Sequence, residues 1–260
     1  GIAGAEMATV ISQLVVFFVF FVMLFFKDHS YISFNLNDFT FSTEILWDII
    51  KVGLPASLSM IVMAVGQGVF NKILVHISVE TVAAYQVAGR LDMLVFLPIF
   101  SIAASLTTLI GMFYGAKEFE ALRFTIRYGI ISALIITIFS SALVYIFADQ
   151  VVRFFTEDES IVLIAVNFLQ IFAFAYPFIA VGITTGRVLQ GLGKGLPVLV
   201  ITIVRVLGVS APLALFFVFI MEKSVEWVWY SMMLSTVVAF AIGLTWLVST
   251  IKKLPVKKSD

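Results

Sequence analysis

The residues best suited to chemistry in this sequence are polar side chains that interrupt long apolar runs. Arg90 lies about ten residues into one predicted span and Asp92 two residues further on, about 15 Å deep at a rise of about 1.5 Å per helical residue. A charge at the centre of a span costs about 2.5–3.5 kcal/mol, so such groups normally face a bundle interior or a wet cavity. Asp92 points about 200° around the helix from Arg90, which favours an intramembrane ion pair between Lys72 and Asp92. That pair would be structural or functional, and both interpretations stay open.

A stripe of polarizable and hydrogen-bonding side chains lies on the preceding span. Its members are spaced by three, four and four residues, which places them on one face of a helix. Methionine offers an adaptable apolar surface, while Gln and Asn supply donors and acceptors. We expect these residues and their neighbours in the next span either to line a substrate cavity or to bond helices to one another. The predicted cavity residues are Met60, Met63, Gln67, Asn71, Gln86, Arg90 and Tyr176.

Enzymatic chemistry has little support in this sequence, and we predict no catalytic residue. His29 and His76 are the only histidines, and neither has a carboxylate or a second histidine at ligand spacing, so no metal site is expected. The Gly-Leu-Gly-Lys-Gly run at 191–195 follows no predicted strand and lacks the Lys-Ser/Thr ending of a phosphate loop. Nothing favours a nucleic-acid partner.

The elements that must position these residues are membrane-spanning helices. Hydrophobic residues make up 62% of the chain and charged residues 12%, which no soluble core could accommodate. Each long uncharged run exceeds the roughly 20 residues that cross a bilayer, and a continuous run of that length must be helical. These runs are 7–26, 52–71, 93–116, 128–148, 160–186 and 227–251, with a seventh at 195–221 that contains Arg205. The sequence predicts an all-α, polytopic membrane protein of about seven spans.

The distribution of basic residues predicts the orientation. Of the 16 Lys and Arg residues, eleven fall on one side of the predicted spans, two on the other side and three within spans. Because Lys and Arg are retained on the cytoplasmic face, we expect a multi-pass protein of the cell membrane with a cytoplasmic C-terminus.

The polar interval after the first span suggests the division into domains. We predict a single span at 1–27, a cytoplasmic connector at 28–44, a six-helix bundle at 45–251 and a cytoplasmic tail at 252–260. The connector would lead into an amphipathic surface helix that starts at Ser42 or Thr43. Because the chain begins without an initiator Met and enters a span almost at once, we expect it to be the C-terminal part of a longer protein.

Several short motifs, in order along the chain, resemble those of the multidrug and toxic compound extrusion (MATE) family. They are Gly-Ile-Ala-Gly-Ala at 1–5, Lys-Val-Gly-Leu-Pro-Ala-Ser at 51–57, Ala-Ala-Tyr-Gln-Val-Ala-Gly-Arg at 83–90, Phe-Thr-Glu-Asp at 155–158 and Leu-Gln-Gly-Leu-Gly-Lys at 189–194. The resemblance implies the sixth helix of an N-terminal lobe at 1–27 and a six-helix C-terminal lobe at 45–251. Arg90 falls where the DNA-damage-inducible branch carries a cavity arginine.

The resemblance also implies a function. Such proteins export organic cations and other amphipathic compounds in exchange for H⁺ or Na⁺. We therefore expect a small amphipathic or cationic substrate, the lipid bilayer and the missing N-terminal lobe as partners, and no cofactor besides the coupling ion. Some members carry coupling acids in the seventh and tenth helices, but the corresponding regions here offer Met63 and an acid-free run at 160–186. The coupling ion would then bind in the missing lobe. A lipid-linked oligosaccharide flippase of the same superfamily and a non-transporting structural subunit are the alternatives.

Overall fold

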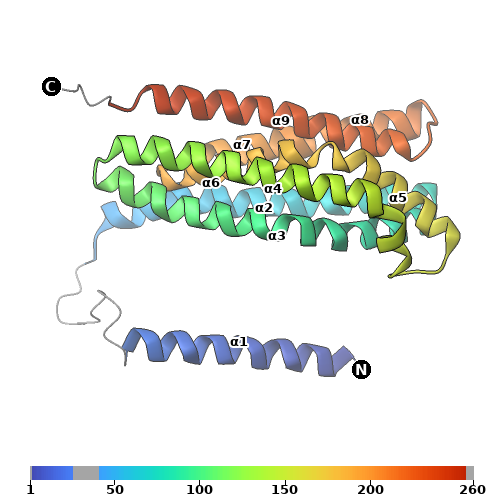
Figure 1. The fold of residues 1–260 in the computed structure, drawn as a ribbon, viewed down its shortest axis with the longest axis horizontal. Coiled ribbons are helices and arrows are strands. Elements are labelled where there is room, and N and C mark those ends of the chain that lie inside the picture. Colours follow the sequence, from blue (N-terminus) through green and yellow to red (C-terminus); the bar gives the residue numbers. More distant parts are fainter. Residues whose placement is uncertain (1, 26–40, 256–260) are drawn as a thin grey trace. The chain divides into compact units, whose positions relative to one another are not determined.

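The structure is a computed structural model that describes residues 2–25 and 41–255, and every regular element in these ranges is a helix (Figure 1). The all-α class is therefore confirmed for the described residues. The elements are α1 (Ile2–Phe25), α2 (Thr43–Ile77), α3 (Val79–Gly115), α4 (Phe119–Arg153), α5 (Glu159–Ala173), α6 (Tyr176–Gly191), α7 (Leu196–Ile203), η2 (Val204–Ser210), α8 (Ala211–Leu215), η3 (Phe216–Ile220) and α9 (Glu226–Lys252), where η denotes a π-helix.

The helices give the number of spans that the apolar runs predict. Six helical stretches are long and apolar enough to cross a membrane, and α5 with α6 is a seventh candidate, bent by 59°. The prediction of about seven spans is confirmed. The stretch from Leu196 to Ile220 counts as one span although two π-helical segments interrupt it. Pro212 has no N–H to donate to the preceding turn, which accounts for a locally altered hydrogen-bond ladder there.

The chain divides into two units, residues 1–43 and residues 44–260, and each is described by itself. In the first unit, α1 is apolar and its residues 6–25 are exposed. The predicted connector at 28–44 falls largely on residues 26–40, and the predicted tail ends on residues 256–260, both outside the described residues. Residues 43–51, predicted to begin as a surface helix, form the first turns of α2 without a break. The domain boundaries stay a prediction.

A one-residue connection at Ser78 joins the end of α2 to the start of α3. The hydroxyl of Ser78 accepts a hydrogen bond from the backbone N–H of Thr81 at 3.1 Å, which satisfies one of the free donors at the start of α3. The last turn of α2 and the first turns of α3 are therefore held close, and side chains from the two helices can meet.

The bundle has α3 and α6 at its centre. Helix α3 packs against α4, α5 and α6, while α9 packs against α5, α6 and the α7–α8 stretch. One buried cluster lies at the end of the bundle where α3 and α9 begin, and it includes Phe168, Tyr176 and Trp229. A second cluster of aliphatic side chains lies at the other end, around Leu106 and Leu189.

Two glycines allow α2 to lie against the rest of the bundle. A Cβ atom on Gly195 would come 2.6 Å from the carbonyl oxygen of Val52, and a Cβ atom on Gly66 would come 2.2 Å from Cγ1 of Val206. Both distances are shorter than van der Waals contact, so these positions accept no side chain without movement. The close approach fixes which face of α2 is covered.

Candidate functional site

The predicted stripe on α2 is mostly exposed in the second unit. Met60 is 73% exposed and Met63 is 52% exposed. Gln67 is also exposed, whereas Asn71 is partly buried. The face of α2 that carries Pro55 and the glycine contact is buried next to this stripe. The stripe therefore forms an open surface rather than a packed one.

The structure brings the end of this stripe to the start of α3. The side-chain amide of Gln86 donates to Oδ1 of Asn71 at 3.4 Å. Arg90 is exposed one turn further along α3, on the same face as Gln86. We call the six predicted cavity residues on these two helix faces the polar stripe, and they are Met60, Met63, Gln67, Asn71, Gln86 and Arg90.

The expected ion pair between Lys72 and Asp92 is not formed. Within residues 41–255 the ion pairs join Arg153 to Asp149 and to Glu159. Lys72 is exposed on α2. Asp92 is partly buried and accepts a hydrogen bond from the hydroxyl of Tyr176 instead.

Tyr176 lies apart from the polar stripe. It is the first residue of α6, directly after the bend, and it is fully buried. Its ring packs edge-on against Phe96, with ring centroids 5.3 Å apart, and against Phe172, with centroids 6.4 Å apart. The seventh predicted cavity residue is therefore part of the bundle interior.

An aromatic cluster extends from Tyr176 toward the start of α9. Phe172 stacks on Phe168 at 4.3 Å between centroids, and Phe168 meets the edge of Trp229 at 4.8 Å. The ring of Tyr85 stacks on Trp229, with ring centroids 5.9 Å apart. We call Tyr85, Asp92, Phe168, Tyr176 and Trp229 the interior group.

Sequence reasoning missed Tyr85 as a neighbour of Asp92, although the signal was present. The two residues are seven positions apart, which is nearly two helical turns and therefore the same face of α3. Tyr85 lies within electrostatic range of Asp92 and of Arg205 from η2. Arg205 is thereby placed beside the interior group.

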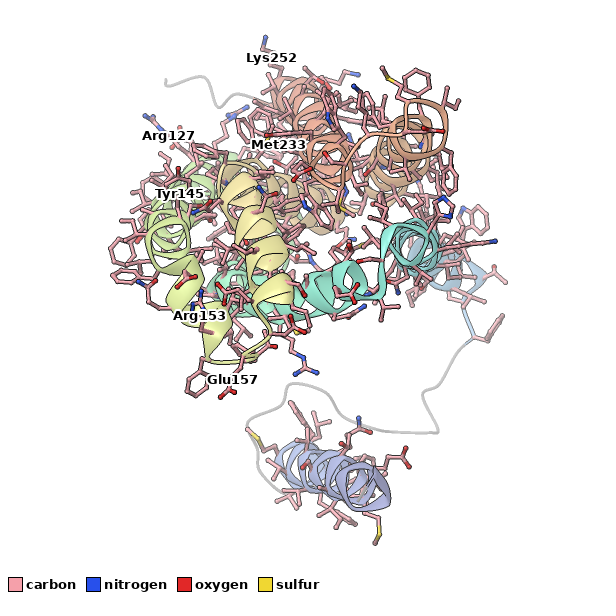
Figure 2. All side chains as sticks on the ribbon, turned by 90° about the vertical axis from the view of Figure 1, so that its right-hand side faces the viewer. Arg127, Tyr145, Arg153, Glu157, Met233 and Lys252 are labelled. Atoms are coloured by element: carbon pink, nitrogen blue, oxygen red, sulfur yellow. The ribbon has the colours of Figure 1, made fainter. Side chains whose placement is uncertain are left out.

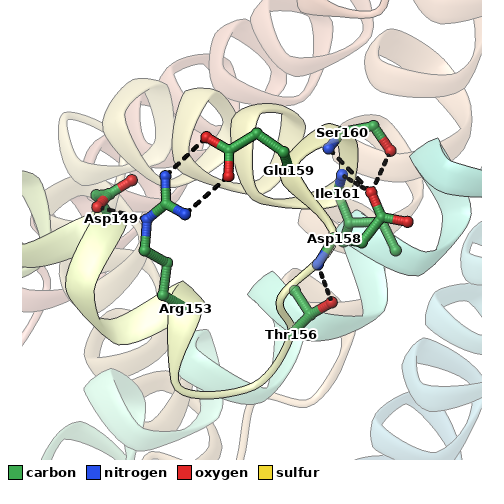
Figure 3. A network of polar contacts seen from close by, with 7 residues as sticks. All are labelled: Asp149, Arg153, Thr156, Asp158, Glu159, Ser160 and Ile161. Carbon is green, nitrogen blue, oxygen red and sulfur yellow. Dashed lines mark hydrogen bonds and ion pairs between the residues drawn. The ribbon is translucent and has the colours of Figure 1, made fainter.

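The turn from α4 to α5 carries exposed charges at the end of the bundle that Figure 2 views, where Arg153 and Glu157 are labelled. The guanidinium of Arg153 donates to both carboxylate oxygens of Glu159 and to Asp149 (Figure 3). Asp158 caps α5, and the hydrogen bond from the Ser160 hydroxyl, with those from the backbone N–H groups of Ser160 and Ile161, lowers the pKa of Asp158. These contacts order the turn and lie outside the polar stripe.

A metal centre has no basis in the described residues. Within residues 2–25 and 41–255 no three His, Asp or Glu side chains gather closely enough to hold an ion. The polar stripe instead combines amide groups, thioethers and one guanidinium, which suits reversible contact with an amphipathic molecule.

Comparison with known protein families matches this sequence to a family of transporters. The model of the MatE family matches residues 55–216, and the chain belongs to that family. Its members are multi-pass membrane transporters and not enzymes, as the sequence predicted.

Individual relatives support the same assignment. The chain is 25% identical over 249 residues to the probable multidrug resistance protein NorM of Thermotoga maritima, covering 96% of this chain and 53% of NorM. It is 27% identical to the multidrug export protein MepA of Staphylococcus aureus, covering 75% of this chain and 43% of MepA. The chain thus spans about half the length of the curated relatives that it matches.

Solved structures agree closely with the fold. A transporter of the MOP superfamily from Pyrococcus furiosus superposes with a TM-score of 0.90 at 32% identity, over 98% of this chain and 57% of the other. An outward-facing MATE multidrug resistance transporter gives a TM-score of 0.90 at 31% identity, over 98% of this chain and 57% of the other.

Proposed function

We propose that this chain forms the C-terminal lobe, with one preceding helix, of a secondary active antiporter. The antiporter exports organic cations, drugs or related amphipathic metabolites in exchange for H⁺ or Na⁺. Family membership and the names of NorM and MepA support export of drug-like molecules. The lobe boundaries near residue 44, the cytoplasmic C-terminus and the need for a second lobe belong to the same proposal.

The exposed polar stripe is the observation that carries the proposal. Gln67, Gln86 and Arg90 are exposed at membrane depth, where lipid hydrocarbon offers no hydrogen-bond partner. Such groups are stable only when they face water or other protein. A surface of this kind on one lobe is what a central cavity between two lobes requires.

The composition of the stripe suits varied ligands. Met60 and Met63 can adapt their shape to different apolar groups, and the amides of Gln67 and Asn71 can donate or accept hydrogen bonds. Arg90 adds a positive charge that needs an acidic partner in the rest of the transporter. We propose that the charge of Arg90 helps to determine which substrates the cavity accepts.

A transport assay on the intact protein that contains this chain tests the proposal. Proteoliposomes are loaded with ethidium, and an inward H⁺ or Na⁺ gradient is imposed. We expect gradient-driven ethidium export, and we expect Gln67→Leu to weaken it. Val65→Leu is the matched control, since Val65 is 51% exposed but lies about 160° around α2 from Met63.

Two results would contradict the proposal. If neither gradient drives export of any organic cation, the antiporter reading is wrong. If Gln67→Leu and Val65→Leu behave alike in a protein that does transport, the polar stripe packs against other helices and does not line the cavity.

A further inference from the structure

Asp92 is an acidic group at membrane depth that the proposed cavity does not use. It is partly buried, it lies about 200° around α3 from Arg90, and its hydrogen bond comes from the hydroxyl of Tyr176. Within residues 41–255 the ion pairs are those of Arg153, so no basic side chain there forms an ion pair with Asp92. A carboxylate in this position is either ionised and poorly compensated or protonated.

The surroundings favour uptake of a proton. Tyr176 and Phe96 are packed edge to face beside Asp92, and Tyr176 has no exposed surface. An ionised carboxylate loses its hydration in such apolar surroundings, and binding a proton removes that cost. One carboxylate and one hydroxyl are few ligands for Na⁺, which needs a fuller shell of oxygens, so the donor set favours H⁺.

The other titratable and charged groups around Asp92 come from three elements. Tyr85 lies on the same face of α3, Tyr176 comes from α6, and Arg205 of η2 acts on Tyr85. Arg205 is partly buried, and its positive charge interacts with Tyr85, which belongs to the interior group. Asp92 is the carboxylate of this group, so it is the residue whose net charge changes when a proton binds.

Tyr176 connects Asp92 to the bend between α5 and α6. The two helices meet at 59°, and Tyr176 is the first residue beyond the break. Pro177 has no N–H for the carbonyl of Ala173, so the helical ladder is interrupted where Tyr176 emerges. A change in the contacts of the Tyr176 ring therefore acts where the helical hydrogen bonds of this span are interrupted.

We infer that Asp92 is a proton-binding residue of this lobe and that Tyr176 links its protonation to the bend between α5 and α6. When Asp92 is ionised, its charge strengthens the hydrogen bond that the Tyr176 hydroxyl donates. When one proton binds, the carboxylate becomes a neutral acid, that bond weakens, and the bend is released. The inference rests on the proposed antiporter, and it places a coupling proton in this lobe as well as, or instead of, the lobe outside this chain.

Infrared difference spectroscopy on the intact protein tests proton binding without requiring transport. We expect a protonated-carboxyl band that appears on acidification and is absent in Asp92→Asn. Tyr176→Phe is expected to keep the band but shift its frequency, because the hydrogen bond to the carboxyl is lost. Asp149→Asn is the matched control, since Asp149 is an exposed aspartate paired with Arg153, and it should leave this band in place.

Transport then tests coupling. We expect Asp92→Asn to lose H⁺-driven ethidium export but to keep gradient-free exchange of labelled for unlabelled ethidium, while Asp92→Glu restores driven export in part. If the unsubstituted protein itself does not exchange labelled for unlabelled ethidium, the proposed function is wrong. The infrared band would still test whether Asp92 binds a proton.

Three results would overturn the inference. The first is a carboxyl band that Asp92→Asn leaves unchanged, and the second is full H⁺-driven export by Asp92→Asn. The third is loss of the band when Na⁺ replaces K⁺ at constant pH, which would make this a sodium site. If Asp92→Asn fails to fold, a carboxyl band whose frequency does not shift in Tyr176→Phe would overturn the inference instead.

Discussion

The polar stripe and the interior group share helix α3 but lie on different faces of it. Gln86 and Arg90 are exposed, while Tyr85 and Asp92, one or two positions away in sequence, point into the bundle. Depth in the membrane is similar for both sets, so depth alone does not decide what a polar residue does. The face decides it, since one face meets the proposed cavity and the other meets α5, α6 and α9.

The two regions should respond to substitution in opposite ways. Truncation of a buried ring in the interior group should alter folding, whereas changes in the polar stripe should alter transport with little effect on folding. Two of the four expected results below test this difference directly and two serve as reference sites outside both regions, in order of decreasing size.

The largest expected effect is a loss of stability from truncation in the interior group. Phe168 is 1% exposed and contacts Trp229 and Phe172, so Phe168→Ala should cost about 3–5 kcal/mol. Met63→Ala, at an exposed position of the stripe, should change stability by about 0.5 kcal/mol or less. Thermal unfolding in detergent measures both, and equal losses would show that the stripe is packed.

A smaller loss is expected where α2 lies against α7. A Cβ atom at Gly195 would meet the backbone of Val52, which cannot turn aside as a side chain can, so Gly195→Ala should cost about 1–3 kcal/mol. Gly182→Ala in α6 is the control, because a Cβ atom there meets nothing within 4 Å. It should be neutral or stabilise the helix by up to about 1 kcal/mol.

The hydrogen bond that joins α2 and α3 should matter more for substrate than for folding. At 3.4 Å and exposed, the Gln86–Asn71 contact should contribute less than about 1 kcal/mol to stability. Gln86→Leu should instead raise the KM for a cationic substrate, because it removes a polar group from the proposed cavity. An unchanged KM together with a large loss of stability would reverse the assignment.

The smallest effect is expected in the turn between α4 and α5, outside both regions. The pKa of Asp158 is lowered by its capping bonds, so its contribution to stability is present above its unfolded pKa and is lost as pH falls through the folded pKa. Asp158→Ala should therefore flatten the acid side of a stability-against-pH curve slightly. Glu157→Gln is the matched control, and an identical curve for both variants would contradict the capping role.

Helical class, number of spans and the polar stripe followed from the sequence because they depend on run length and helical period. Met60, Met63, Gln67 and Asn71 have a spacing that forces one face, and the one-residue turn at Ser78 places Gln86 opposite Asn71. These features are local.

The partner of Asp92 could not be found in the same way. Its hydrogen bond joins positions 84 residues apart, and it depends on the bend that puts Tyr176 at the start of α6. Helical period excluded Arg90 as the partner, but it could not choose between Lys72 and a tyrosine on a distant helix. Tertiary packing made that choice.

Cysteine labelling at Met63 and Val65 tests the central claim most directly. The chain has no native cysteine, and the two side chains are 52% and 51% exposed on different faces of α2. In the intact protein, a membrane-impermeant maleimide should label Met63→Cys, and substrate should slow that labelling. Val65→Cys should stay unlabelled, because lipid or other protein surrounds that face of α2. Equal labelling of the two positions, or no labelling of Met63→Cys, would contradict a water-filled cavity lined by the polar stripe.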